Sequence, residues 1–160
     1  GEEPYTLAFE AHDFFGASFI SNGGLRILGS DVNTDVLESA IHGCYAEKLL
    51  SPIPDSFRRR YFTSESEKLN SHNQIKTEIQ RLIQFRHFNL MSSKYPIATK
   101  FQLIFCRNVL YYLQPERREF LIRKLVDHLE EGGWLVLGIT ESGYSIDKME
   151  KHSISIYQKP

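Results

Sequence analysis

The segment 101–112 constrains the fold most, because it joins a short apolar run, a polar turn and a helix start. Residues 101–106 are mostly apolar, which is typical of a strand buried on both faces of a parallel sheet. Arg107 and Asn108 end this run, and Pro115 suits the first turn of a following helix. In an open parallel sheet, ligands bind beyond the carboxyl ends of the strands. Arg107 and Asn108 are therefore candidate site residues, although ordinary loop residues would close the same turn equally well.

Helices and strands alternate along the rest of the chain, which predicts an α/β domain with a mostly parallel sheet. Apolar periodicity predicts strands over 25–30, 83–89, 134–139 and 154–158, and helices from Glu2, over 33–41 and over 115–130. Gly132 and Gly133 are expected to stop the last helix. The apolar stripe expected on the first helix consists of Leu7, Ala8, Ala11, Phe14 and Phe15.

Polar residues follow several of these strands, and the carboxyl ends of parallel strands meet at one edge of a sheet. The residues concerned are Asp31, Asn33, Asn89, Arg107, Asn108, Thr140 and Glu141. An acid after the second strand of such a fold suits a ribose, because a carboxylate accepts two hydrogen bonds from neighbouring hydroxyls. A glycine at the start of the first helix lets a ligand approach backbone donors.

Residues 43–84 differ from the alternating pattern and are interpreted as an insertion. Pro52 and Pro54 interrupt the periodicity, and residues 63–73 are polar and expected to form an exposed loop. The basic triplet 58–60 is followed by two aromatic residues. A solvated face on a short helix is the favoured explanation for the triplet, and a docking surface is the alternative.

Composition excludes several classes of function. The 160 residues suffice for one domain with its own core, and a formal net charge of -1 argues against a nucleic-acid surface. No apolar run is long enough to span a bilayer, and the acidic opening lacks the basic region of a signal peptide. Two distant cysteines favour a cytoplasmic setting, and the six histidines show no metal-ligand spacing, so no metal is expected. No phosphate-binding Gly-x-x-x-x-Gly-Lys loop is present.

The sequence resembles the C-terminal, catalytic domain of the CheR-type chemotaxis receptor methyltransferases. The most specific matching block is Phe-Cys-Arg-Asn-Val-Leu-Tyr-Tyr at 105–112. The other pieces occur in the family's order and spacing, at 1–8, 29–37, 59–62, 88–90, 132–135 and 140–142. The resemblance extends from Gly1 to about Tyr157.

The resemblance implies a Rossmann-like class I methyltransferase sheet with helices on both faces and a small inserted β-subdomain at 43–84. It implies transfer of a methyl group from S-adenosylmethionine to a glutamate γ-carboxylate of a chemoreceptor, as in a protein-glutamate O-methyltransferase. The products would be a glutamyl methyl ester and S-adenosylhomocysteine. The partner would be the receptor's cytoplasmic domain or its tail peptide, which can dock on residues 43–84 in this family.

The resemblance also assigns roles to individual residues. Tyr112 and Arg107 would be catalytic, with Tyr112 facing the methyl group and the incoming carboxylate. A half-buried aromatic residue at a helix start is the alternative explanation of Tyr112. The residues implied in cofactor binding are Gly1 and Glu2 near the methionine part, Asp31 at the ribose, Asn89 and Leu90 beside the adenine, and Arg107 and Asn108 in the pocket.

The chain departs from the family pattern in three ways. Asn33 and Ile139 replace an acidic residue and a histidine that are usual in the family. The resemblance also begins at the last glycine of a family turn, so the first central strand is expected to be missing and residues 1–160 to be an incomplete catalytic domain. Alone, the chain is expected to be poorly stable or inactive unless another segment fills that position. The alternatives are a catalytically inactive docking module in a signalling protein and, less favoured, a small-molecule methyltransferase.

Overall fold

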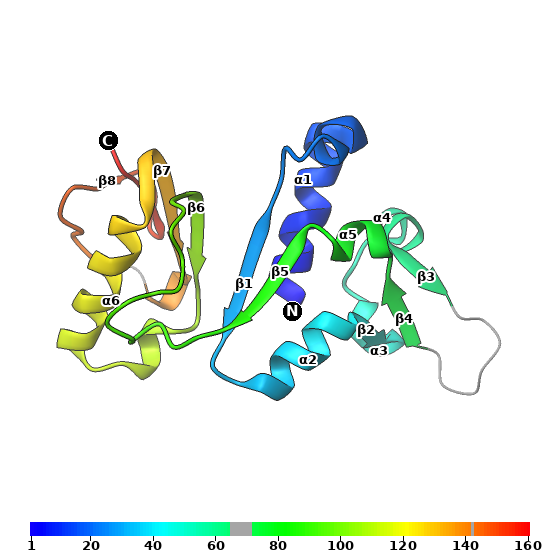
Figure 1. Ribbon diagram of the computed structural model, residues 1–160, viewed down its shortest axis with the longest axis horizontal. Coiled ribbons are helices and arrows are strands. Elements are labelled where there is room, and N and C mark those ends of the chain that lie inside the picture. Colours follow the sequence, from blue (N-terminus) through cyan, green and yellow to red (C-terminus); the bar gives the residue numbers. More distant parts are fainter. Residues whose placement is uncertain (65–71, 142) are drawn as a thin grey trace. The chain divides into compact units, whose positions relative to one another are not determined.

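The computed structural model describes residues 1–64, 72–141 and 143–160 (Figure 1). The chain forms two compact units, Gly1–Asn89 (unit 1) and Leu90–Pro160 (unit 2). Each unit has its own cluster of buried apolar side chains. The prediction of one catalytic domain over 1–160 with an insertion at 43–84 stays a prediction.

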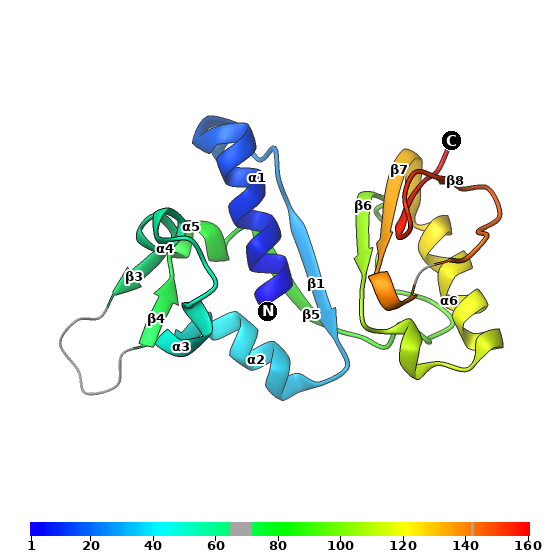
Figure 2. The same cartoon turned by 180° about the vertical axis from the view of Figure 1, so that it is seen from behind.

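In unit 1, a helix packs along a two-stranded parallel sheet. Strand β1 (Ile27–Asp31) pairs with β5 (Ile83–His87), so that Asp31 lies opposite His87. Helix α1 (Glu2–Ser21) lies beside this sheet in both views (Figures 1 and 2). Helix α2 (Thr34–His42) follows β1 directly. Among the described residues, β1 pairs with β5 alone.

The side chains of α1 that belong to the core cluster of unit 1 come from its first part. Tyr5, Ala8 and Phe9 are buried, whereas Phe14 is 83% exposed. Gly16 has φ 80° and ψ 161°, a conformation open to glycine that kinks the helix. The predicted stripe is therefore right for Ala8 and wrong for Phe14 and Phe15, whose rings contact each other at 4.8 Å between centres and remain exposed.

Residues between α2 and β5 build a small antiparallel sheet with strand order β2-β4-β3. Its strands are β2 (Cys44–Ala46), β3 (Phe62–Ser64) and β4 (His72–Ile75). The short helices of this region are α3 (Glu47–Leu50), α4 (Asp55–Tyr61) and α5 (Thr77–Gln80). The small β-subdomain expected in the fold is thus present. Part of its predicted polar loop, residues 65–71, lies outside the described residues.

In unit 2, a helix connects two parallel strands of a four-stranded sheet with order β6-β7-β9-β8. The elements are β6 (Phe101–Cys106), the single turn η1 (Leu110–Tyr112), α6 (Pro115–Asp127), β7 (Leu129–Leu137), the turn η2 (Ile139–Glu141), β8 (Glu150–Lys151) and β9 (Ile156–Gln158). Helix α6 lies alongside the sheet in both views (Figures 1 and 2). Parallel strands joined by helices in both units confirm the predicted α/β class.

Two predictions about unit 2 are wrong. The strand at 101–106 is not buried on both faces: Cys106 is buried, but Leu103 is 47% exposed, because β6 pairs with β7 alone among the described residues. Gly132 and Gly133 do not stop the helix, since α6 ends at Asp127. The glycine pair lies inside β7, where the register against β6 shifts and Gly132 has φ 76°.

Residues 1–64, 72–141 and 143–160 contain neither a membrane-spanning helix nor a cluster of metal ligands. No helix there is both long enough and apolar enough to cross a membrane. No group of three or more histidine, cysteine, aspartate or glutamate side chains is arranged there to hold a metal ion.

Candidate functional site

The predicted site residues divide between the two units. Gly1, Glu2, Asp31 and Asn89 belong to unit 1, whereas Leu90, Arg107, Asn108 and Tyr112 belong to unit 2. Each unit therefore carries its own part of the candidate site.

Asp31 ends β1 and organises the turn that follows it. Its Oδ1 accepts a hydrogen bond from the backbone N–H of Asn33 at 2.9 Å. Asn33 Oδ1 in turn accepts from the N–H groups of Asp35 at 2.8 Å and Val36 at 3.2 Å, and so caps α2. Among the described residues no donor to Asp31 Oδ2 is found, so this oxygen remains able to accept a ligand hydroxyl. The predicted helix start at Asn33 is confirmed.

Gly1 lies in a tight cradle at the start of α1. A Cβ atom on Gly1 would lie 2.7 Å from the Cβ of Ala40 and 3.2 Å from the Tyr45 hydroxyl oxygen. Any larger residue would therefore collide with α2. The neighbouring Glu2 is exposed, and hydrogen bonding from its own backbone amide lowers the pKa of its carboxyl group.

The Tyr45 hydroxyl beside this cradle is a group that sequence reasoning missed. It is buried and has no hydrogen-bond partner among the described residues. Burial raises the pKa of Tyr45 above its ordinary value of 10.0, so the hydroxyl remains protonated and able to donate at neutral pH. An unpaired buried donor is costly, which makes this hydroxyl a candidate ligand-binding group. Tyr45 lies outside the segments expected to bind the cofactor.

Asn89 and Leu90 are joined by the peptide bond between the two units. Asn89 is exposed and follows β5, whereas Leu90 is partly buried against the core of unit 2. The backbone oxygen of Leu90 accepts a hydrogen bond from the Tyr95 hydroxyl at 2.5 Å. This bond fixes the backbone just after the predicted adenine-side residues.

Arg107, Asn108 and Tyr112 lie on the polar turn after β6, as predicted. Asn108 has φ 59°, a left-handed conformation that asparagine adopts more readily than most residues. Leu110 is fully buried and anchors the turn η1, whereas the neighbouring Tyr111 and Tyr112 are 72% and 81% exposed. The exposure of Tyr112 disagrees with a half-buried aromatic residue and leaves its hydroxyl accessible to a substrate.

Glu141 holds this turn in place from the end of η2. Its carboxylate is only 4% exposed and accepts two backbone hydrogen bonds, from Asn108 N at 2.7 Å and Tyr111 N at 3.0 Å. The sequence placed Glu141 at a strand end and in a matching motif but gave it no role. Thr140 beside it is exposed, and Ser142 of the same motif lies outside the described residues.

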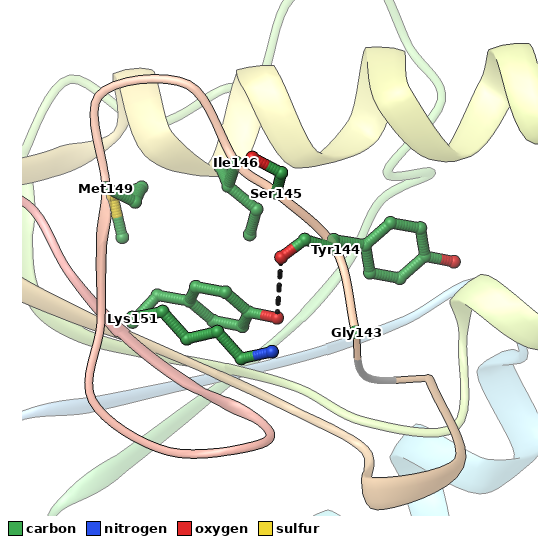
Figure 3. Close-up of a pocket in the computed structure, with 7 residues that line it drawn as sticks. Gly143, Tyr144, Ser145, Ile146, Met149 and Lys151 are labelled. Atoms are coloured by element: carbon green, nitrogen blue, oxygen red, sulfur yellow. Dashed lines mark hydrogen bonds between the residues drawn. The ribbon is translucent and has the colours of Figure 1, made fainter.

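A cavity of about 260 Å³ in unit 2 lies apart from these residues in the sequence (Figure 3). Its lining runs from Gly143 to Tyr157, and the Tyr157 hydroxyl donates to the backbone oxygen of Tyr144 at 3.2 Å. None of the predicted site residues lines this cavity.

The arginines of the small β-subdomain are engaged in ion pairs. Arg58 pairs with Glu47 and, at 3.8 Å, with Asp55, whereas Arg60 pairs with Asp13 at 2.5 Å. The Arg60 side chain is 48% exposed. These contacts agree with the favoured explanation of the triplet as a solvated face on a short helix.

The chain matches known proteins along most of its length. A family described as "CheR methyltransferase, SAM binding domain" matches residues 1–157. A chemotaxis protein methyltransferase of Borreliella burgdorferi is 30% identical over 160 residues, which are 99% of this chain and 55% of that protein. The Escherichia coli K12 chemotaxis protein methyltransferase is 30% identical over 142 residues, with 89% and 49% covered. The chain therefore spans about half the length of the curated relatives it matches.

A solved structure of the glycopeptide N-methyltransferase MtfA with S-adenosyl-L-methionine is also similar, at 15% identity and a TM-score of 0.43. The match covers 94% of this chain and 50% of the MtfA chain. The family match confirms the predicted resemblance, and its description names the predicted cofactor. By sequence over nearly its whole length, this chain belongs to the CheR methyltransferase family, to its S-adenosylmethionine-binding domain.

Proposed function

We propose that this chain binds S-adenosylmethionine and catalyses methyl transfer to glutamate γ-carboxylates of chemotaxis receptors. The observation that carries this proposal is the family match over residues 1–157, which includes the Cys-Arg-Asn-Val-Leu block at 106–110. That block forms the end of β6 and an ordered polar turn, where an α/β sheet offers side chains to a ligand.

The groups present in unit 1 fit such a cofactor. Asp31 Oδ2 suits a ribose hydroxyl, because it needs a donor and the turn around it is already fixed. Gly1 and Glu2 are proposed to contact the methionine part. The absence of a side chain at Gly1 and the unpaired Tyr45 hydroxyl beside it support this assignment. Carboxylates and backbone donors at a helix start complement the ammonium and carboxylate groups of an amino acid.

Asn89, the last residue of unit 1, and Leu90, the first of unit 2, are proposed to contact the adenine side. In unit 2, Arg107 and Asn108 are proposed to line the pocket. When bound, S-adenosylmethionine supplies a methyl group attached to a positively charged sulfur. A glutamate carboxylate is nucleophilic at neutral pH, so the protein has to align it and exclude water rather than remove a proton. We assign the alignment to the Tyr112 hydroxyl, which can donate to the carboxylate, and to the Arg107 guanidinium, which attracts it.

The receptor is proposed to dock through residues 43–84. The order β2-β4-β3 supports this, because β2 and β3 are the outer strands of the small sheet and outer strands present unpaired backbone groups. A chemoreceptor tail peptide or cytoplasmic domain is the proposed partner. Deleting the tail should weaken docking without changing cofactor affinity.

The first experiment is calorimetric titration of S-adenosylhomocysteine into this chain and into a version extended upstream. Binding to the extended version alone would support the expectation that an upstream segment completes the site. Binding to neither would contradict the proposed function and favour a docking module without catalysis.

Methyl transfer to a receptor fragment is then compared between Tyr112→Phe and Tyr111→Phe. Loss of the orienting hydroxyl in Tyr112→Phe should lower kcat about tenfold or more and leave S-adenosylhomocysteine affinity nearly unchanged. Tyr111→Phe removes the hydroxyl of a neighbouring tyrosine that is also largely exposed, and it serves as the matched control. Equal rates for both variants would remove Tyr112 from the proposed mechanism.

A further inference from the structure

We propose that Glu141 is a positioning residue that fixes the backbone of segment 107–112, the segment carrying Arg107 and Tyr112. Its effect on catalysis rests on the proposed function, whereas its effect on the backbone does not. From the sequence, Glu141 was placed among the polar residues at strand ends and assigned no role in the site.

Both oxygens of the Glu141 carboxylate are used to hold the segment. Oε2 accepts from the N–H of Asn108 at 2.7 Å, and Oε1 accepts from the N–H of Tyr111 at 3.0 Å. One side chain therefore ties together two points of the turn that are three residues apart in sequence. Rotation of either peptide plane would break one of these bonds.

The bonds offset two local costs. Asn108 has φ 59°, a left-handed backbone conformation that is unfavourable for a residue with a side chain. Glu141 is 4% exposed, and a buried carboxylate is unfavourable without donors. Hydrogen bonds from N–H groups to a charged acceptor are stronger than neutral ones, so each partner stabilises the other.

Packing around Glu141 leaves little freedom for its carboxylate. A Cβ on Gly138 would lie only 2.6 Å from Oε2, so glycine at this position makes room for the carboxylate. The Glu141 backbone N–H donates to the Gly138 oxygen at 2.9 Å and closes η2. The segment that follows β7 therefore places the Glu141 carboxylate against the turn after β6.

The proposed catalytic residues flank the points that Glu141 holds. Arg107 directly precedes Asn108, and Tyr112 directly follows Tyr111. The Tyr112 N–H also donates to the Val109 oxygen at 3.3 Å, and Leu110 is fully buried. Because the backbone between them is anchored, the directions in which Arg107 and Tyr112 leave the turn are set by Glu141.

The test compares the unsubstituted chain with Glu141→Gln, which keeps the size of the side chain but replaces one acceptor oxygen with an amide. Amide hydrogen exchange, measured by NMR without ligand, should become about tenfold to a hundredfold faster at Asn108 or Tyr111. Gly138→Ala, which displaces Oε2, should accelerate exchange at Asn108 in the same way. Unchanged exchange at both amides in both variants would overturn the proposal.

Two controls separate positioning from a general loss of stability. Glu131→Gln changes an exposed acid of the same unit, paired with Lys159 at 3.2 Å, and should leave both amides protected. Val126→Ala weakens the buried core of unit 2 through α6 and leaves both hydrogen bonds to Glu141 in place. The positioning role would be overturned if Val126→Ala slowed methyl transfer as much as Glu141→Gln does when the two variants are equally stable.

Activity gives the second readout. In a chain that methylates a receptor fragment, Glu141→Gln should lower kcat about tenfold while Glu131→Gln leaves it unchanged. Faster amide exchange with an unaltered kcat would overturn the catalytic part of the proposal. If the unsubstituted chain binds no S-adenosylhomocysteine, the proposed function fails, and the exchange rates at 108 and 111 still decide whether Glu141 positions the turn.

Discussion

The turns that follow β1 and β6 are held by different kinds of contact. After β1, Asp31 bonds to Asn33, and Asn33 bonds to Asp35 and Val36, so each partner lies two or three residues away. After β6, the turn is held by Glu141, which is 33 residues from Asn108 and 30 from Tyr111. The turn after β1 can therefore form together with helix α2, which follows it directly. The turn after β6 forms only once β7 has packed against β6.

The cores of the two units also differ, in the kind of side chain that fills them. Unit 1 is rich in aromatic rings, with Phe9 stacked on Tyr61 at 4.6 Å between ring centres and 4° between planes. The core of unit 2 is mainly aliphatic and joins α6 to β7. Its fully buried members include Leu121, Leu129 and Leu135. The turn after β6 therefore depends on a core that joins distant parts of unit 2, and Glu141 sets the local geometry of the turn within that core.

The largest expected effect is on this aliphatic core. Leu121→Ala removes a fully buried side chain and should lower the free energy of unfolding of unit 2 by about 3 kcal/mol. Trp134 in β7 is the one tryptophan of the chain, so its fluorescence during urea unfolding reports on unit 2. Phe120→Ala is the control, since Phe120 is 38% exposed and should cost clearly less. Equal losses for both variants would contradict the assigned helix face.

An intermediate effect is expected at the local turn. Asn33→Ala removes the cap of α2 and should destabilise unit 1 by about 1 kcal/mol. Asn33→Asp keeps a capping oxygen and should retain most of that stability. Circular dichroism during urea unfolding measures both. A loss of order at Asn108 in Asn33→Ala would contradict the separation between the two turns.

The smallest effect on stability is expected at Tyr45. Tyr45→Phe removes a buried hydroxyl that has no partner among the described residues, so the free energy of unfolding should change by less than about 0.5 kcal/mol. Affinity for S-adenosylhomocysteine, measured by calorimetry, should nevertheless fall if this hydroxyl binds the ligand.

Tyr5→Phe is the matched control for that measurement. The Tyr5 hydroxyl is buried and donates to the Ala40 oxygen at 2.8 Å, so its removal should cost about 1 kcal/mol of stability. A stability loss in Tyr45→Phe as large as that in Tyr5→Phe would mean that the Tyr45 hydroxyl is paired in solution.

Several elements were predictable because their signals are local. The bounds of β6, the start of α6 at Pro115 and the cap at Asn33 all follow from neighbouring residues. The errors arose where tertiary packing overrode a local pattern. The Gly132 and Gly133 pair looked like a helix stop but lies within a strand, and Phe14 and Phe15 continue an apolar stripe in the sequence but are exposed in the structure.

The sequence by itself determined the family, the α/β class and the turn that carries Arg107, Asn108 and Tyr112, because short motifs and residue periodicity record these features. Only the tertiary structure revealed that Glu141 supports this turn and that the Tyr45 hydroxyl lies beside Gly1. The physical reason is sequence separation. A hydrogen bond across two or three residues is specified by its own segment, whereas a bond across thirty residues exists only after distant strands have packed together.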